Sequence, residues 1–147
     1  MAAIRRAHAV WQGDLINGSG SVSATTSQAF QNLAVTWASR TEAADGRTSP
    51  EELIAAAHAS CFAMALSYGL ANAGTPPQRL EVDCAVTFDR TDQGWRVTSS
   101  ALTVRGRVPG IDAEQFRQAA ENAKDNCPVS QALKGNVALS VEAVLER

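Results

Sequence analysis

Three cysteines are the residues of this chain best suited to chemistry. Cys61, Cys84 and Cys127 are widely spaced among the 147 residues. No C-x-x-C pair or His/Cys cluster indicates zinc, and so few thiols do not make a disulfide scaffold. The pattern indicates neither a metal nor an organic cofactor, so we consider each thiol as an individual candidate for nucleophilic or redox chemistry.

Cys61 ends the sequence SPEELIAAAHASC, which predicts the start of a long apolar helix. Ser49 is the expected N-cap, Pro50 suits the first helical position and Glu52 completes a capping box. Glu51 has no such local role. It either interacts favourably with the helix N-terminus or takes part in a site.

Glu51 and Cys61 cannot meet within one straight helix. Their separation is about 15 Å along the axis and roughly 80° around it. If the two residues act together, Glu51 comes from a partner chain whose equivalent helix crosses this one.

Cys61 needs a positively charged neighbour, because burial in an apolar helix raises the pKa of a thiol. Arg40 and Arg47 are nearest in the sequence. Arg40 follows the strand-like segment AVTWAS, which could aim its guanidinium, whereas Arg47 lies in an expected loop and should be solvated. His58 lies one turn before Cys61 and could be its base, although a lone histidine on such a helix is more often a packing residue.

The other two thiols have different predicted surroundings. Cys127 precedes Pro128 in NCPVSQAL, so it is the expected N-cap of a short helix, a position that favours the thiolate. Cys84 lies on the apolar face of a predicted strand. We expect it to have a packing role.

The predicted elements alternate between strands and helices. Short β-branched runs broken at INGSGS predict two or three antiparallel strands, after which LAVTWASR runs extended into a loop. The apolar helix is followed by the alternating strand RLEVDCAVTFDR and by WRVTSSALTVRGRV, with a bulge near Ser99 and Ser100. Asp112 and Gln115 begin a second helix as a capping box, and VALSVEAVLE predicts a last strand. This order indicates one α+β domain over residues 1–147.

The composition excludes several classes of partner. With 13 basic and 15 acidic side chains, the chain has no excess of positive charge that would favour binding to nucleic acid or to an anionic membrane. The apolar helix, Leu53 to Ala73, is long enough to span a membrane but is rich in alanine and lacks flanking anchors. Because it is apolar on all sides, we expect its own sheet to cover one side and a second copy the other. The start, MAAIRRAHAVWQGDL, has no signal-peptide run, so we expect a cytoplasmic protein.

Two stretches together, SPEELIAAAHASCFAMALS and NCPVS, resemble the OsmC/Ohr family of thiol-dependent peroxidases. The resemblance implies an intertwined α+β homodimer with antiparallel sheets wrapped around central buried helices and two sites at the interface. Cys61 would attack an organic hydroperoxide and Cys127 would resolve the sulfenic acid as a redox-active disulfide. Arg40 and Glu51 would assist. An external thiol reductant, possibly a dihydrolipoyl protein, would restore the thiols.

The chain also departs from the pattern of the family that it resembles. The residue after the arginine is usually aromatic but here is Thr41, and the loop to Glu51 is one residue longer. We therefore expect a more polar or differently shaped peroxide pocket.

Two other functions stay open at the level of sequence. A non-catalytic, stress-associated, small-molecule-binding dimer would need neither thiol. A cysteine-dependent hydrolase would use Cys61 with His58 as base and would not need Cys127.

Overall fold

The computed structural model describes all residues, 1–147, and divides the chain into two compact units, Met1–Leu53 and Ile54–Arg147. The first unit contains an antiparallel sheet with the strand order β1-β2-β3. Its strands are β1 (Ala7–Gln12), β2 (Ser19–Ala24) and β3 (Leu33–Val35). The turn predicted at INGSGS joins β1 to β2.

A short helix, α1 (Trp37–Thr41), follows β3, so the prediction that LAVTWASR is extended throughout was wrong. The Thr36 hydroxyl accepts from the Ser39 amide and the Ser39 hydroxyl accepts from the Thr36 amide, both at 3.0 Å. This reciprocal cap satisfies donors that a helix start leaves open. Arg40 therefore lies in the last turn of a helix rather than after a strand.

The long apolar helix is α2 (Pro50–Asn72), which begins where the sequence predicts. The Ser49 hydroxyl accepts from the Glu52 amide at 3.1 Å. The other half of the expected capping box differs, because the Glu52 carboxylate accepts from the Thr48 hydroxyl at 2.7 Å. The helix start is thus fixed by residues on both sides of Ser49.

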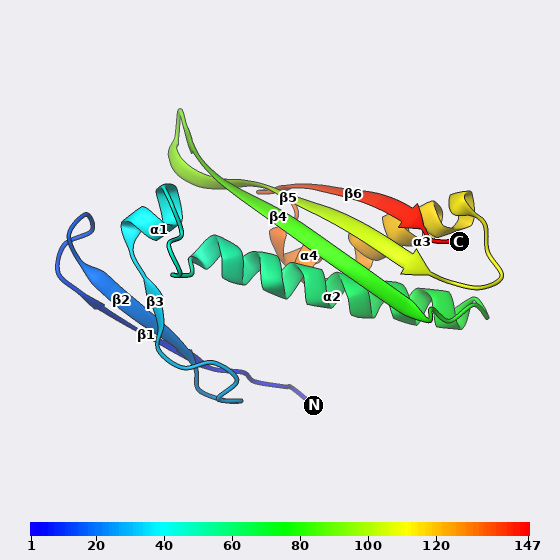
Figure 1. The fold of residues 1–147 in the computed structure, drawn as a ribbon, viewed down its shortest axis with the longest axis horizontal. Helices are drawn as coiled ribbons and strands as arrows, with labels where there is room; N and C mark the ends of the chain where they lie inside the picture. The colour runs from blue at the N-terminus through cyan, green and yellow to red at the C-terminus, as the bar shows by residue number, and fades with distance from the viewer. The chain divides into compact units, whose positions relative to one another are not determined.

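A second sheet, with the order β4-β5-β6, forms one layer of the second unit (Figure 1). Its strands are β4 (Arg79–Thr91), β5 (Gly94–Arg107) and β6 (Ala138–Leu145), and the unit's other helices are α3 (Ala113–Asn126) and α4 (Pro128–Leu133). Strands β4 and β5 are antiparallel. Thr87 pairs with Ser99 and Phe88 with Val97, so Thr98 is the extra residue of a bulge next to the predicted position.

Strand β6 pairs parallel with β5, which corrects the expectation of purely antiparallel sheets. Helices α3 and α4 connect the two strands, and a helical crossover of this kind is what a parallel pair requires. The Asp112 cap with Gln115 starts α3, as predicted.

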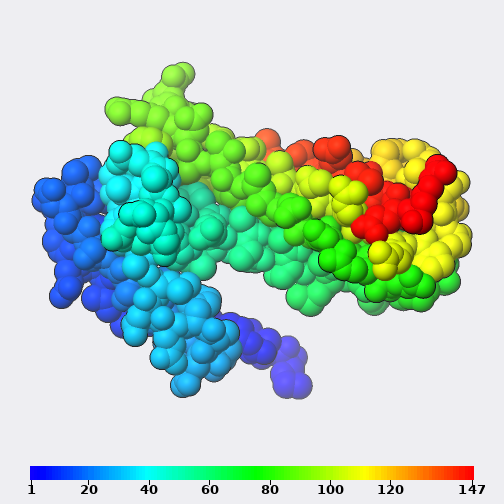
Figure 2. All heavy atoms as spheres, viewed as in Figure 1, coloured from blue at the N-terminus to red at the C-terminus, as the bar shows by residue number.

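Both long helices pack against the same face of this sheet. The core combines Phe62, Leu66 and Leu70 of α2 with residues of β5 and α3, including Leu102 and Phe116. Full burial of each large apolar side chain stabilises the fold by about 1.5–3 kcal/mol. Figure 2 shows the green atoms of α2 and β4 and the yellow and red atoms of β5, α3 and β6 as one continuous body in this unit.

Helix α2 buries only part of its surface in this chain. Met64 is 69% exposed and Tyr68 71% exposed. By length and composition the helix could cross a membrane, but core helices meet the same criteria, so this is weak support for a membrane role. These apolar side chains are not covered within one chain, and a second copy, as the sequence predicts, would cover them.

Candidate active site

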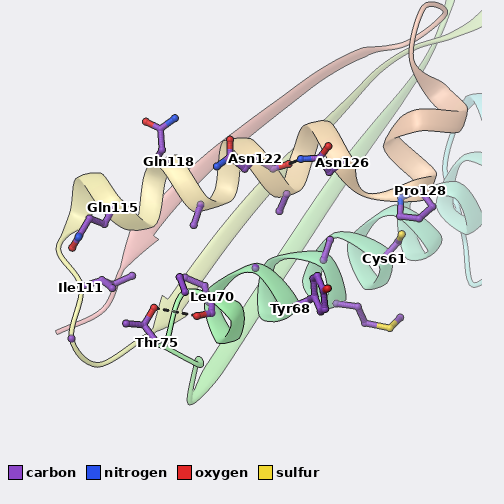
Figure 3. Close-up of a pocket in the computed structure, with 17 residues that line it drawn as sticks. Cys61, Tyr68, Leu70, Thr75, Ile111, Gln115, Gln118, Asn122, Asn126 and Pro128 are labelled. Carbon is purple, nitrogen blue, oxygen red and sulfur yellow. Dashed lines mark hydrogen bonds between the residues drawn. The ribbon is translucent and has the colours of Figure 1, made fainter.

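The structure brings Cys61 and Cys127 together within the second unit. Cys61 lies on α2, and Cys127 is the N-cap of α4, as predicted, with its sulfur accepting from the Ser130 amide at 3.4 Å. Each thiol is close enough to shift the pKa of the other. Figure 3 shows Cys61 beside Pro128, the first residue of α4. Two neighbouring thiols on different helices are the starting arrangement that disulfide formation needs.

The pKa values of the two thiols move in opposite directions. Burial raises the pKa of Cys61, and the neighbouring Cys127 raises it further, against a hydrogen bond from the Val129 amide. Burial also acts to raise the pKa of Cys127, but hydrogen bonds from the Ser130 amide and hydroxyl, and one from Cys61, outweigh it and lower that pKa. Negative charge on the pair is therefore favoured at Cys127.

A second pair, Arg40 with Glu51, lies in the first unit. Arg40 Nε donates to both carboxylate oxygens of Glu51 at 2.9 and 3.1 Å, and Nη2 donates to one of them at 2.9 Å. Glu51 is only 6% exposed. This bidentate contact is formed within one chain, and it fixes the plane of the guanidinium.

The surroundings of Arg40 include an aromatic ring and the hydroxyl of Thr41. The Trp37 ring lies one turn earlier in α1, with the Arg40 guanidinium carbon 5.9 Å from its centroid. The Thr41 hydroxyl donates to the Trp37 carbonyl at 2.9 Å. Arg47, by contrast, pairs with exposed Asp45 at 3.5 Å and is solvated, as expected.

His58 is hydrogen-bonded to two serines, as a packing residue would be, and no bond to Cys61 supports the alternative role as its base. Its Nδ1 lies 2.6 Å from the Ser100 hydroxyl and its Nε2 lies 2.8 Å from the Ser130 hydroxyl. Burial lowers the pKa of His58 and keeps the imidazole neutral. Since both ring nitrogens are occupied, the hydrolase hypothesis loses its general base.

A groove of about 1020 Å³ opens beside Cys61, between α2 and α3. Figure 3 shows Tyr68 and Leu70 on α2, and Gln118, Asn122 and Asn126 along α3. Apolar side chains and side-chain amides share the lining. A small molecule with an apolar body fits this character.

Sequence reasoning missed the roles of Trp37, Ser100 and Ser130. Ser100 was noted only for the bulge, and Ser130 is part of a quoted motif without an assigned role. Single serines carry no periodic or spacing signal that could reveal a partner distant in the sequence.

Comparison with known proteins identifies the family. The model of the family described as OsmC-like protein matches residues 43–142. The chain belongs to the OsmC-like family. Glu51, Cys61 and Cys127 lie within the matched range, whereas Arg40 precedes it.

Relatives support the same membership along the whole chain. The OsmC-like chain is 41% identical over 142 residues to peroxiredoxin OsmC of Escherichia coli, covering 97% of this chain and 98% of that protein. It is 30% identical over 101 residues to the organic hydroperoxide resistance protein OhrA of Bacillus subtilis, covering 65% and 66%. Crystalline OhrB of Bacillus subtilis has the same fold, with a TM-score of 0.74 at 22% identity over 94% of this chain and 97% of that one. The predicted family and α+β OsmC-like fold are confirmed.

Proposed function

We propose that this protein is a thiol-dependent peroxidase that reduces organic hydroperoxides, with hydrogen peroxide as a second candidate substrate. The observation that carries the proposal is that Cys61 on α2 lies beside the start of α4, where Cys127 is the N-cap, and that the two thiols shift each other's pKa in opposite directions. The names of the relatives, a peroxiredoxin and organic hydroperoxide resistance proteins, support a peroxide-detoxifying role.

The first step is attack of the Cys61 thiolate on one peroxide oxygen. The oxygen–oxygen bond breaks, Cys61 becomes a sulfenic acid, and the other oxygen leaves as an alkoxide that takes up a proton to give the alcohol. The guanidinium of Arg40 stabilises both the thiolate and the departing oxygen, and Glu51 holds it in place. Cys127 then displaces hydroxide from the sulfenic acid to form the disulfide. An external dithiol, for which a dihydrolipoyl protein is our candidate, reduces the disulfide again.

The active form is a homodimer in this proposal, with one domain per chain and a cytoplasmic location. Within its own unit Cys61 has a raised pKa, so a cation has to draw the negative charge from Cys127 to Cys61. Because Glu51 and Cys61 cannot meet along one helix, and Glu51 binds Arg40, we assign both residues to the partner's site. Exposed Met64 and Tyr68 on α2 support a second copy as the cover.

Mass spectrometry after one equivalent of cumene hydroperoxide tests this function. We expect the parent chain to lose two hydrogens and to give a Cys61–Cys127 disulfide peptide. Cys61→Ser should consume no peroxide, whereas Cys127→Ser should complete one turnover and leave Cys61 as a sulfenic acid that dimedone traps. An unchanged mass in the parent would instead support a non-catalytic binder that uses the groove.

A further inference from the structure

A buried chain of hydrogen bonds ends at Cys127 and has no part in the mechanism above. The Cys84 sulfur lies 3.1 Å from the Ser100 hydroxyl, which lies 2.6 Å from His58 Nδ1. On the other side of the ring, His58 Nε2 lies 2.8 Å from the Ser130 hydroxyl. The Ser130 amide in turn donates to the Cys127 sulfur at 3.4 Å, and the Ser130 hydroxyl lowers the pKa of that thiol. Four elements, β4, β5, α2 and α4, thus meet at one imidazole.

The number of protons allows two directions for this chain of hydrogen bonds, one for each tautomer of His58. A neutral imidazole has one N–H and one acceptor nitrogen, and each serine hydroxyl has one hydrogen to donate. If the Ser100 hydroxyl donates to Nδ1, the ring proton is on Nε2 and donates to the Ser130 oxygen. The hydroxyl hydrogen of Ser130 is then available to the sulfur of Cys127. In the opposite tautomer, His58 Nε2 is an acceptor and the Ser130 hydroxyl donates to it. The Ser130 amide would then be the only donor from Ser130 to the Cys127 sulfur.

No ion explains the preference of the charge for Cys127. The partners of His58, Ser100 and Ser130 include no charged side chain. The titratable groups that face the chain are Cys84 from β4 at one end, and Cys127 with Cys61 of α2 at the other. Directed hydrogen bonds are therefore the means by which this unit stabilises a thiolate.

We propose that His58 is a positioning residue for the resolving step: as the Nε2–H tautomer, set by Ser100, it turns the Ser130 hydroxyl toward Cys127 and keeps that thiol ionised. The proposal rests on the peroxidase function proposed above. In the step it serves, the Cys127 thiolate forms the sulfur–sulfur bond, the sulfur–oxygen bond of the Cys61 sulfenic acid breaks, and the hydroxide that leaves takes a proton to become water. The peroxide already consumed is the only oxidant required.

The direct test is the tautomer of His58 in the unmodified protein. Nitrogen-15 NMR of the imidazole distinguishes Nε2–H from Nδ1–H, and we expect Nε2–H in the reduced protein at neutral pH. A ring proton on Nδ1 would overturn the proposal. This measurement requires no substitution, so it decides the question even if a variant does not fold.

The second test follows the Cys127 thiolate without any peroxide. In a Cys61→Ser background, ultraviolet thiolate absorbance is titrated with pH, and peptide mass after alkylation assigns the first thiol to ionise. Ser130→Ala and Ser100→Ala break the chain on opposite sides of His58, and each should move the Cys127 midpoint upward. Ser140→Ala removes an exposed hydroxyl on β6 and should leave it unchanged. An unmoved midpoint in both chain variants would refute the role of His58.

The third test measures the resolving step in chains that retain Cys61. Loss of one hydrogen bond to a charged sulfur should lengthen the lifetime of the dimedone-reactive sulfenic acid roughly tenfold at neutral pH in Ser130→Ala. The difference in lifetime between Ser130→Ala and the parent should decrease as the pH rises, because Cys127 then ionises without the Ser130 hydroxyl. A delay equal at every pH would indicate a purely structural effect and contradict the proposal. If the parent forms no sulfenic acid, the peroxidase function fails, while the tautomer and the titration still decide the role of His58.

Discussion

At the level of single residues, the proposed nucleophile Cys61 and the proposed activating group Arg40 have different partners. Cys61 has a raised pKa among its own neighbours, and Arg40 is held rigidly by Glu51 with 30% of its side chain exposed. A cation beside a thiol stabilises the thiolate and lowers the pKa of the thiol. We therefore expect the arginine to control the reactivity of Cys61.

Arg40→Met tests this control while preserving much of the side-chain volume. Without the cation the pKa of Cys61 should rise, so alkylation of Cys61 and peroxide reduction at neutral pH should slow roughly tenfold or more. Glu51→Gln should cause a smaller loss of peroxidase rate and a Cys61 pKa no higher than in the parent, because a nearby anion has been removed. Alkylation rates measured against pH, with the Cys61 peptide quantified, check both. An unchanged profile in Arg40→Met would contradict the role of the cation.

His58 should make the stability of the protein depend on pH. Burial lowers the pKa of its imidazole below the ordinary 6.5. The unfolded chain has the ordinary pKa and the folded chain the lowered one. Between the two, the unfolded chain binds a proton that the folded chain does not, so the free energy of unfolding falls as the pH falls below about 6.5. Urea denaturation at several pH values measures this. His58→Gln should weaken the dependence, and His8→Gln on exposed strand β1 should preserve it.

At the level of elements, β5 connects the core to the site. Its even-numbered residues face the helices and include Ser100, Leu102 and Val104, all buried. The same face thus supplies both the apolar contacts of α2 and α3 and the hydroxyl that bonds His58. Small changes in how α3 packs on β5 should therefore be costly.

Gly106→Ala tests the packing of α3 on β5. An added Cβ would collide with the Phe116 ring, approaching its Cε1 to 2.7 Å, and would lie 3.1 Å from Leu80 Cδ2. Phe116 is fully buried in the core between α3 and β5. We expect a loss of about 1–3 kcal/mol in the free energy of unfolding. Thr103→Ala, at an exposed position on the same strand, should change it by less than about 0.5 kcal/mol. Equal denaturation midpoints for the two variants would contradict this packing argument.

At the level of the whole molecule, the two functional pairs belong to different compact units. Arg40 and Glu51 lie in Met1–Leu53, and the two thiols lie in Ile54–Arg147. Because one bidentate contact joins Arg40 to Glu51, the pair should act on the same Cys61, whichever chain supplies it.

A mixed dimer distinguishes the two assignments. Sedimentation equilibrium should first show a stable homodimer at micromolar concentration. A dimer of one Arg40→Met chain with one Cys61→Ser chain, isolated with two affinity tags, would have one intact and one doubly altered site if Arg40 serves the partner. It would then retain about half of the parent activity. If Arg40 serves its own chain, each site would carry one lesion and the activity would fall to that of the Arg40→Met site.

The sequence by itself determined the elements and their caps. Alternation in RLEVDCAVTFDR, and the caps at Ser49, Asp112 and Cys127, are local patterns that act within one turn or one strand, and the structure confirms them. The same locality explains the error at α1, where a β-branched, apolar run concealed the Thr36–Ser39 cap. The motifs around Cys61 and Cys127 also indicated the family before any contact was known.

Only the tertiary structure decided how these residues meet. Three observations join positions far apart in the chain. The two thiols are neighbours, His58 is hydrogen-bonded to Ser100 and Ser130, and β6 pairs parallel with β5. The pKa shifts followed from those contacts, because burial and hydrogen-bond donors around a sulfur come from several elements at once. The sequence shows which groups can ionise, but the pKa of each group depends on neighbours that the fold brings together.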